Sequence, residues 1–212
     1  MNHRSKISLY LALTAVLTSV ALCADTPVAL VNPGFEDPFK NGWDLWISPD
    51  SLPNNCHCEV TTETPHSGSA CLKLSADAIS RFSAGRKEVF PVQAAERYRI
   101  GIWVRGDAEF ANSSAVFLVR ITLAPAISGS GSDLLHIGLD GKITRNADPY
   151  TNAPLSAQWK RVTAVFEIPA TAQKMGIGVF LWNAKGNIYI DDFTLEKVDA
   201  ATPLSEMTSR SK

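Results

Sequence analysis

The chain has 212 residues, of which 45% are apolar and 19% are charged, with 20 Lys and Arg against 21 Asp and Glu. This composition supports a buried core of ordinary size within a single domain. A net charge of −1, with no basic run, excludes nucleic acid as the expected partner.

The first 24 residues predict a secretory signal peptide. Arg4 and Lys6 precede an apolar run from Leu9 to Leu22, and small residues follow around Ala24. The run is shorter than the roughly 20 residues that a membrane-spanning helix needs. We therefore expect cleavage near Ala24, a secreted, periplasmic or extracellular protein, and no membrane span after cleavage.

Three cysteines follow the signal peptide: Cys56, Cys58 and Cys71. Residues 57–63 and 70–75 predict two strands joined by a loop, which would bring Cys71 opposite Cys56 or Cys58. An oxidising compartment permits one disulfide, and Cys58–Cys71 is the favoured pair. A zinc site that includes His57 and His66 is disfavoured, because Cys-x-Cys lacks the two-residue spacing of common zinc sites.

Short alternating segments bounded by Gly, Pro, Asn and Asp predict an all-β chain. We expect two antiparallel sheets packed as a β-sandwich jelly roll over residues 25–198. Residues 134–139 and 142–146 predict a hairpin that turns at Asp140-Gly141. Residues 199–212 have little to bury and are expected to form a disordered tail. The expected strands are residues 57–63, 70–75, 87–92, 97–106, 114–124, 159–169, 174–182 and 187–198.

Alternation within two of these strands places aromatic side chains away from the core. In residues 97–106, Trp103 shares the outward face with Arg99 and Arg105. In residues 174–182, Phe180 and Trp182 share it with two glycines, and glycine inside a strand often marks the close approach of another molecule.

Six segments in order resemble the carbohydrate-binding modules of the CenC type, families 4, 9 and 22. They are "LVNPGFEDPFKNGW", "HSGSACLKL", "RYRIGIWVRG", "QWKRVTAVFEIPA", "IGVFLW" and "GNIYIDDFTL". The resemblance covers about residues 28–198 and implies a galactose-binding-like jelly roll. It also implies a secreted module, usually attached to a glycoside hydrolase, that binds polysaccharide or oligosaccharide in a groove on its concave sheet.

The resemblance further implies a structural calcium ion. Its ligands would be the side chains of Glu36 and Asp191 and backbone oxygens near Ser67 and Gly68, with Asp192 as the alternative to its neighbour. Calcium takes six to eight oxygen ligands, so this donor set is chemically sensible. The alternative is that these carboxylates only cap turns or pair with basic residues.

Sugar rings pack on aromatic faces, and polar side chains at the edge orient the hydroxyl groups. The family pattern assigns Phe35 and Trp43 to the core, and we assign Arg81 to a loop surface. The alternative for Trp103 is burial as a small second core under residues 125–157. The expected sugar contacts are Trp46, Trp103, Tyr150, Phe180 and Trp182, with Arg99, Arg105 and Asn183 beside them.

The sequence contains none of the common catalytic motifs, and its acids fall among polar strand or loop residues. We therefore expect a non-catalytic module that binds a glycan polymer such as xylan or β-glucan. Two alternatives stay open. One is a cell-envelope interaction protein that does not bind glycan, and the other is a hydrolase of glycosyl bonds or an accessory part of one.

Overall fold

The computed structural model describes residues 25–112, 114–125, 133–145 and 155–208, so the expected signal peptide lies outside the described residues. The described chain is built almost entirely of antiparallel strands, as the sequence predicts. Within it, no helix is long and apolar enough to cross a membrane. The elements are β1 (Thr26–Pro27), β2 (Trp43–Ile47), η1 (Pro49–Asn54), β3 (His57–Thr61), β4 (Cys71–Pro91), β5 (Arg97–Gly106), α1 (Ala108–Ala111), β6 (Val116–Ala124), β7 (Asp133–Ile137), β8 (Ile143–Arg145), β9 (Lys160–Glu167) and β10 (Lys174–Val198).

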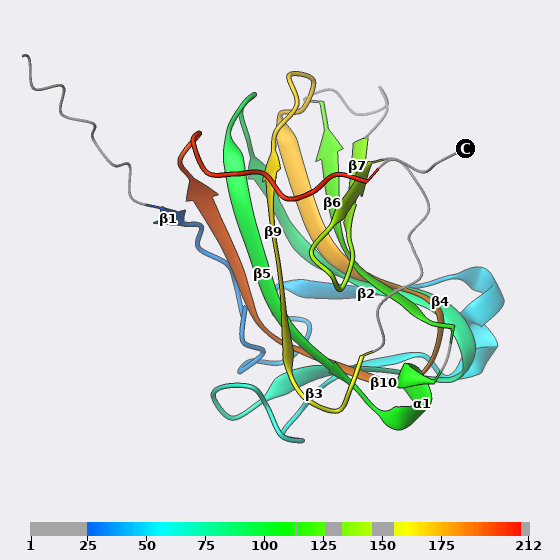
Figure 1. Ribbon diagram of the computed structural model, residues 1–212. Helices are drawn as coiled ribbons and strands as arrows, with labels where there is room; N and C mark the ends of the chain where they lie inside the picture. The colour runs from blue at the N-terminus through cyan, green and yellow to red at the C-terminus, as the bar shows by residue number, and fades with distance from the viewer. Residues whose placement is uncertain (1–24, 113, 126–132, 146–154, 209–212) are drawn as a thin grey trace, which may run out of the picture.

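The strands form two packed layers because β4 and β10 bend and run through both (Figure 1). The first sheet has the order β2, β4, β10, β6, β7 and β8, and uses residues 82–91 of β4 with residues 174–182 of β10. The second sheet contains β3, residues 71–76 of β4, residues 186–198 of β10, β5 and β9. β1 pairs with the end of β10.

In the structure, β4 and β10 each combine two of the strands that the sequence predicts as separate. Residues 70–75 and 87–92 both belong to β4, and residues 174–182 and 187–198 both belong to β10. Register shifts on both sides of Ala184 let β4 and β10 turn from one layer to the other while they stay paired. The positive φ angles of Asn183 (52°) and Gly186 (91°) mark this turn in the backbone.

The core lies between the two layers and follows the alternation that the sequence predicts. In β5 the core-facing side chains are those of Tyr98, Ile100, Ile102 and Val104, and in residues 174–182 of β10 those of Met175, Ile177, Val179 and Leu181. Phe35 and Trp43 are fully buried with ring centroids 5.0 Å apart, and Trp43 also packs on Phe193 at 5.5 Å. The expectation that Phe35 and Trp43 are structural is confirmed.

The hairpin predicted at Asp140-Gly141 is present between β7 and β8. Gly141 has a φ of 78°, and its N–H donates to the Gly138 carbonyl at 2.9 Å. Glycine suits this turn because residues with a side chain rarely adopt a positive φ.

The expected Cys58–Cys71 disulfide is not formed, because the register of β3 on β4 separates the two residues. Cys58 lies opposite Leu74, whereas Cys71 lies opposite Thr61, so the cysteines are three positions apart and on opposite faces of the sheet. Three positions span about 10 Å, beyond the roughly 7 Å that a disulfide tolerates between Cα atoms. All three described cysteines are free, and burial raises the pKa of Cys71 to about 11.

The segment after β10 is ordered through Thr208, which corrects the expectation of a disordered tail for residues 199–208. It crosses β9 and reaches the β7–β8 hairpin (Figure 1). The Ser205 N–H donates to the Val165 carbonyl at 2.9 Å, and the Thr208 N–H donates to the Ile143 carbonyl at 2.9 Å. This segment covers apolar surface at the open end of the sandwich. Its own composition does not indicate this role.

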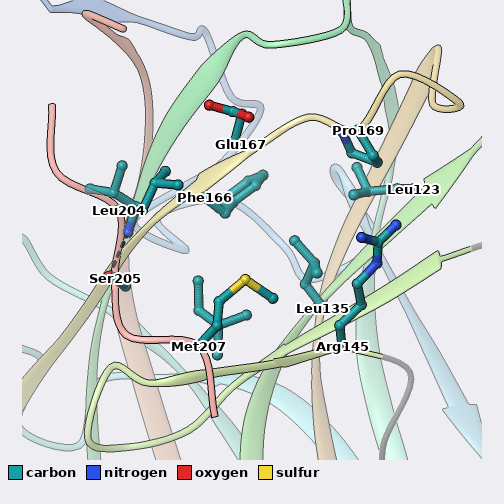
Figure 2. Close-up of a pocket in the computed structure, with 11 residues that line it drawn as sticks. Leu123, Leu135, Arg145, Phe166, Glu167, Pro169, Leu204, Ser205 and Met207 are labelled. Atoms are coloured by element: carbon teal, nitrogen blue, oxygen red, sulfur yellow. Dashed lines mark hydrogen bonds between the residues drawn. The ribbon is translucent and has the colours of Figure 1, made fainter. Parts of the chain in front are cut away.

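Beneath this segment lies a mainly apolar cavity of about 200 Å³. Figure 2 shows Leu204 and Met207 on one side of it, with Phe166 and Leu135 across from them. Arg145 also lines the cavity but forms an ion pair with Asp133. The C-terminal segment thus closes one end of the core.

Deleting residues 203–212 should destabilise the fold by about 2–4 kcal/mol. The deletion removes four hydrogen bonds to Val165 and Ile143, each contributing about 0.5–1.5 kcal/mol, and uncovers the cavity. Urea denaturation followed by tryptophan fluorescence measures this change. An unchanged unfolding midpoint would show that the segment contributes nothing to stability.

Candidate functional site

The outward face of the first sheet carries an aromatic cluster at the β2 side. Trp46 and Phe180 both lie opposite Ser83, so their side chains share this face. The Phe180 ring lies 6.1 Å from Trp46 and 6.1 Å from Trp182, measured between centroids. Phe180 is only 4% exposed and forms the floor, whereas Trp46 is 47% exposed. The face therefore presents tryptophan rings with the buried Phe180 ring beneath them.

Arg81 lies between the two tryptophans of this cluster. Its guanidinium carbon is 6.0 Å from the Trp46 ring and 5.4 Å from the Trp182 ring. The guanidinium donates to the Ser48 hydroxyl at 2.9 Å, and the Arg81 N–H donates to the Ser51 hydroxyl at 2.9 Å. Arg81 is thus a fixed strand residue of β4, which corrects its assignment to a loop surface.

A hollow of about 200 Å³ lies beside the cluster, and glycines make much of its floor. A Cβ atom at Gly85 would meet nothing within 4 Å, so this position leaves open space. At Gly178 a Cβ atom would lie 2.9 Å from the Ala84 carbonyl oxygen, so only glycine allows the strands to approach here. The glycines of residues 174–182 therefore allow the strands to pack closely and also line the hollow.

Arg120 of β6 lines the same hollow and was not predicted as a site residue. It lies opposite Gly178, and its guanidinium carbon is 3.9 Å from the centroid of Phe180. Burial lowers the pKa of Arg120, and its Nε atom has no hydrogen-bond partner. The sequence signal that could have identified Arg120 is the presence of an arginine inside the otherwise apolar strand of residues 116–124.

Trp103 and Arg105 lie elsewhere, on the outward face of the second sheet. The Trp103 ring stacks on the His66 ring at 3.8 Å, so the loop between β3 and β4 covers it. Most of residues 125–157, which the sequence offered as an alternative cover, lie outside the described residues. The Arg105 guanidinium lies 3.7 Å from the Tyr189 centroid and donates to the Glu63 carbonyl at 2.7 Å. The face carrying Trp103 is therefore opposite to the face carrying Trp182, and the sequence could not separate the two.

The remaining predicted sugar contacts are Arg99, Asn183 and Tyr150. Arg99 donates to Asp25 at 2.6 Å and to Glu196 at 2.9 Å, which leaves it in an ion-pair cluster. Asn183 is exposed next to Trp182, at the turn of β10 between the two sheets. Tyr150 lies outside the described residues.

The expected calcium ligands do come together from three distant segments. The Glu36 carboxylate accepts hydrogen bonds from the Ser69 N–H at 3.0 Å and the Ser69 hydroxyl at 2.6 Å, which lower the pKa of Glu36. The fully buried Asp191 carboxylate accepts from the N–H groups of His66 at 2.9 Å and Ser67 at 3.2 Å. The loop thus offers N–H donors to the carboxylates of this cluster.

This arrangement does not fit the expected calcium site. Calcium requires converging oxygen atoms, whereas the loop around Gly68 turns the N–H groups of Ser67 and Ser69 toward the carboxylates. In the described part of the chain, no group of three or more His, Cys, Asp or Glu is arranged to hold a metal ion. His66 Nδ1 lies 2.5 Å from Asp192 Oδ2, so an imidazole is the group placed against that carboxylate.

No protein-family model and no curated protein sequence matches this chain, whereas solved structures match its fold. The xylanase 10B CBM22-1–GH10 modules of Clostridium thermocellum align with a TM-score of 0.56 and 12% identity, covering 86% of this chain and 30% of that one. The enzymatically active domain of bacteriophage CBA120 tailspike protein 4 gives 0.54 and 14%, covering 78% and 21%. A CBM22 xylan-binding domain gives 0.50 and 13%, covering 87% and 99%.

The chain spans less than a third of the first two of these structures and nearly all of the third. At such low identity the likeness concerns the fold. The fold is the β-sandwich of carbohydrate-binding modules, as the sequence resemblance implies.

Removal of calcium should leave the stability of this protein unchanged, because Glu36 and Asp191 accept N–H hydrogen bonds from the loop, although burial still raises the pKa of Asp191. We expect the melting temperature in EDTA to match that in millimolar calcium chloride, measured by differential scanning calorimetry. A calcium-dependent rise of several degrees would show instead that the loop rearranges to present its carbonyl oxygens.

Proposed function

We propose that this chain is a secreted, non-catalytic module that binds a polysaccharide or oligosaccharide on the outward face of its first sheet. The observation that carries the proposal is the exposed Trp46 and the half-buried Trp182 beside a hollow that is lined by glycines. Export rests on the sequence of residues 1–24. Xylan and mixed-linkage β-glucan are the first polymers to test.

The chemistry of this face suits a sugar ring. The C–H groups of a pyranose pack on a tryptophan face, and the ring hydroxyls need donors and acceptors at its rim. Arg81 lies within reach of both tryptophan rings, and Asn183 is exposed beside Trp182. The open space at Gly85 extends this surface along the sheet, as a chain of several sugar units requires.

The acid content of this face supports binding rather than hydrolysis. A glycosidase needs two carboxyl groups about 5–10 Å apart across the bond that it cleaves. The residues that line the hollow include no Asp or Glu. Asp44, on the adjacent strand β2, lies within 4 Å of Lys40 and Lys87 and is surface exposed.

Replacing Trp46 or Trp182 by alanine should weaken glycan binding about tenfold or more. An exposed aromatic anchor contributes at least about 1–2 kcal/mol when it is removed, and 1.4 kcal/mol is a factor of ten. Titration calorimetry with xylan and mixed-linkage glucan gives the affinities.

Trp103→Ala is the matched control, because it removes the same side chain from the opposite face. It should lower the melting temperature, since Trp103 packs on His66, and leave the affinity for glycan unchanged. Loss of binding in this variant alone would place the site on the second sheet. Absence of binding to any polysaccharide by the folded wild type would favour the cell-envelope interaction role.

Gly85→Leu offers a test that adds a side chain instead of removing one. The added atoms enter open space, so the variant should fold normally while filling the hollow. We expect glycan affinity to fall at least about tenfold at an unchanged melting temperature. Full affinity in this variant would show that the sugar does not enter the hollow.

A further inference from the structure

The guanidinium of Arg120 is partly buried without a carboxylate partner. Within the described chain, no Asp or Glu lies within 4 Å of it, and its Nε atom has no acceptor. Burying a charge without a partner costs free energy, so such a group is a candidate for a ligand contact. Four other arginines differ, since Arg86, Arg97, Arg99 and Arg145 each pair with a carboxylate. The Nε atom of Arg105 also has no acceptor, but its guanidinium donates to the Glu63 carbonyl.

Arg81 adds a second positive charge at the other side of the Phe180 floor. Its hydrogen bonds from the guanidinium go to the neutral Ser48 hydroxyl, and no carboxylate of the described chain lies within 4 Å of it. Both arginines contact the aromatic cluster, Arg120 through Phe180 and Arg81 through Trp46 and Trp182. The cluster is therefore flanked by two cations that nothing described on the protein neutralises.

The hollow gives a ligand access to Arg120. Gly178 lies directly opposite Arg120 on one side, and Gly85 lies opposite Gly178, so no side chain at these two positions blocks the guanidinium. On its other side Arg120 lies opposite the buried His136. Arg120 and both glycines line the same hollow. A group bound there would meet the donors of Arg120 while the rest of the ligand extends to the tryptophans.

We propose that this face binds a negatively charged glycan, with the carboxylate of a uronic acid or a sulfate ester at Arg120 and a neighbouring sugar ring on Trp46 and Trp182. The inference rests on the glycan-binding function proposed above and names its substrate class. Guanidinium groups bind carboxylate and sulfate through paired N–H donors, and these bonds are stronger than those to neutral hydroxyls. The net charge of the chain is −1, so a general attraction to polyanions does not supply this preference.

Matched pairs of polysaccharides test the proposal by titration calorimetry on the purified protein. The uronate pair is glucuronoxylan against xylan freed of its glucuronate, and the sulfate pair is dextran sulfate against dextran. We expect at least about tenfold tighter binding to the charged member of one pair, which also identifies the anionic group. The preference should shrink as salt rises from 50 to 300 mM.

Variants at Arg120 connect this preference to the residue. Arg120→Gln should lower the affinity for the charged polymer more than the affinity for its neutral partner, so that the ratio of the two affinities falls to about one. Arg120→Lys keeps the charge but not the paired donors, and should keep part of the preference. Arg161→Gln removes the same charge from an exposed position on the second sheet and should change neither affinity.

The outcomes separate the two proposals. Equal affinity for both members of each pair, lost in Trp46→Ala, would overturn the anionic preference and keep the glycan-binding function. A charge preference that survives in folded Arg120→Gln, or is lost in Arg161→Gln, would also overturn the role of Arg120. Failure of every polymer to bind would overturn the function itself.

Discussion

The pairing of β4 with β10 extends through both layers of the sandwich, and the placement of the aromatic residues depends on it. Residues 82–91 and 71–76 of β4 meet two different stretches of β10, with register shifts between them. These shifts decide which side chains of each strand face the core and which face outward. Moving the register by one residue would turn Phe180 and Trp182 into the core and Leu181 outward.

The two outward faces that result have different chemistry. On the second sheet, Trp103 and Arg105 are covered by the loop before β4, and Arg99 is held in ion pairs. On the first sheet, Trp46 is exposed, and Arg81 and Arg120 lie beside aromatic rings. Arg99 pairs with carboxylates and Arg105 donates to the Glu63 carbonyl, whereas Arg120 has neither kind of partner in the described chain. The first sheet is therefore the face with capacity for a ligand.

Much of the fold follows from the sequence, because alternation is a local property. It predicts the buried sets of β5 and β10 correctly, and the turn at Gly141. The relation between strands is not local, so the sequence could not show that Trp103 and Trp182 lie on opposite faces or that Cys58 and Cys71 lie apart. Arg81 and Arg120 were missed as site residues because their neighbours come from other strands.

The most direct test of the glycan-binding face follows the tryptophan indole N–H signals by NMR. The chain has five tryptophans, and each gives its own indole signal in a ¹⁵N-labelled sample. On addition of oligosaccharides from glucuronoxylan, the account predicts that the signals of Trp46 and Trp182 move while those of Trp43, Trp103 and Trp159 stay in place. Movement of the Trp103 and Trp159 signals, with those of Trp46 and Trp182 unchanged, would contradict it.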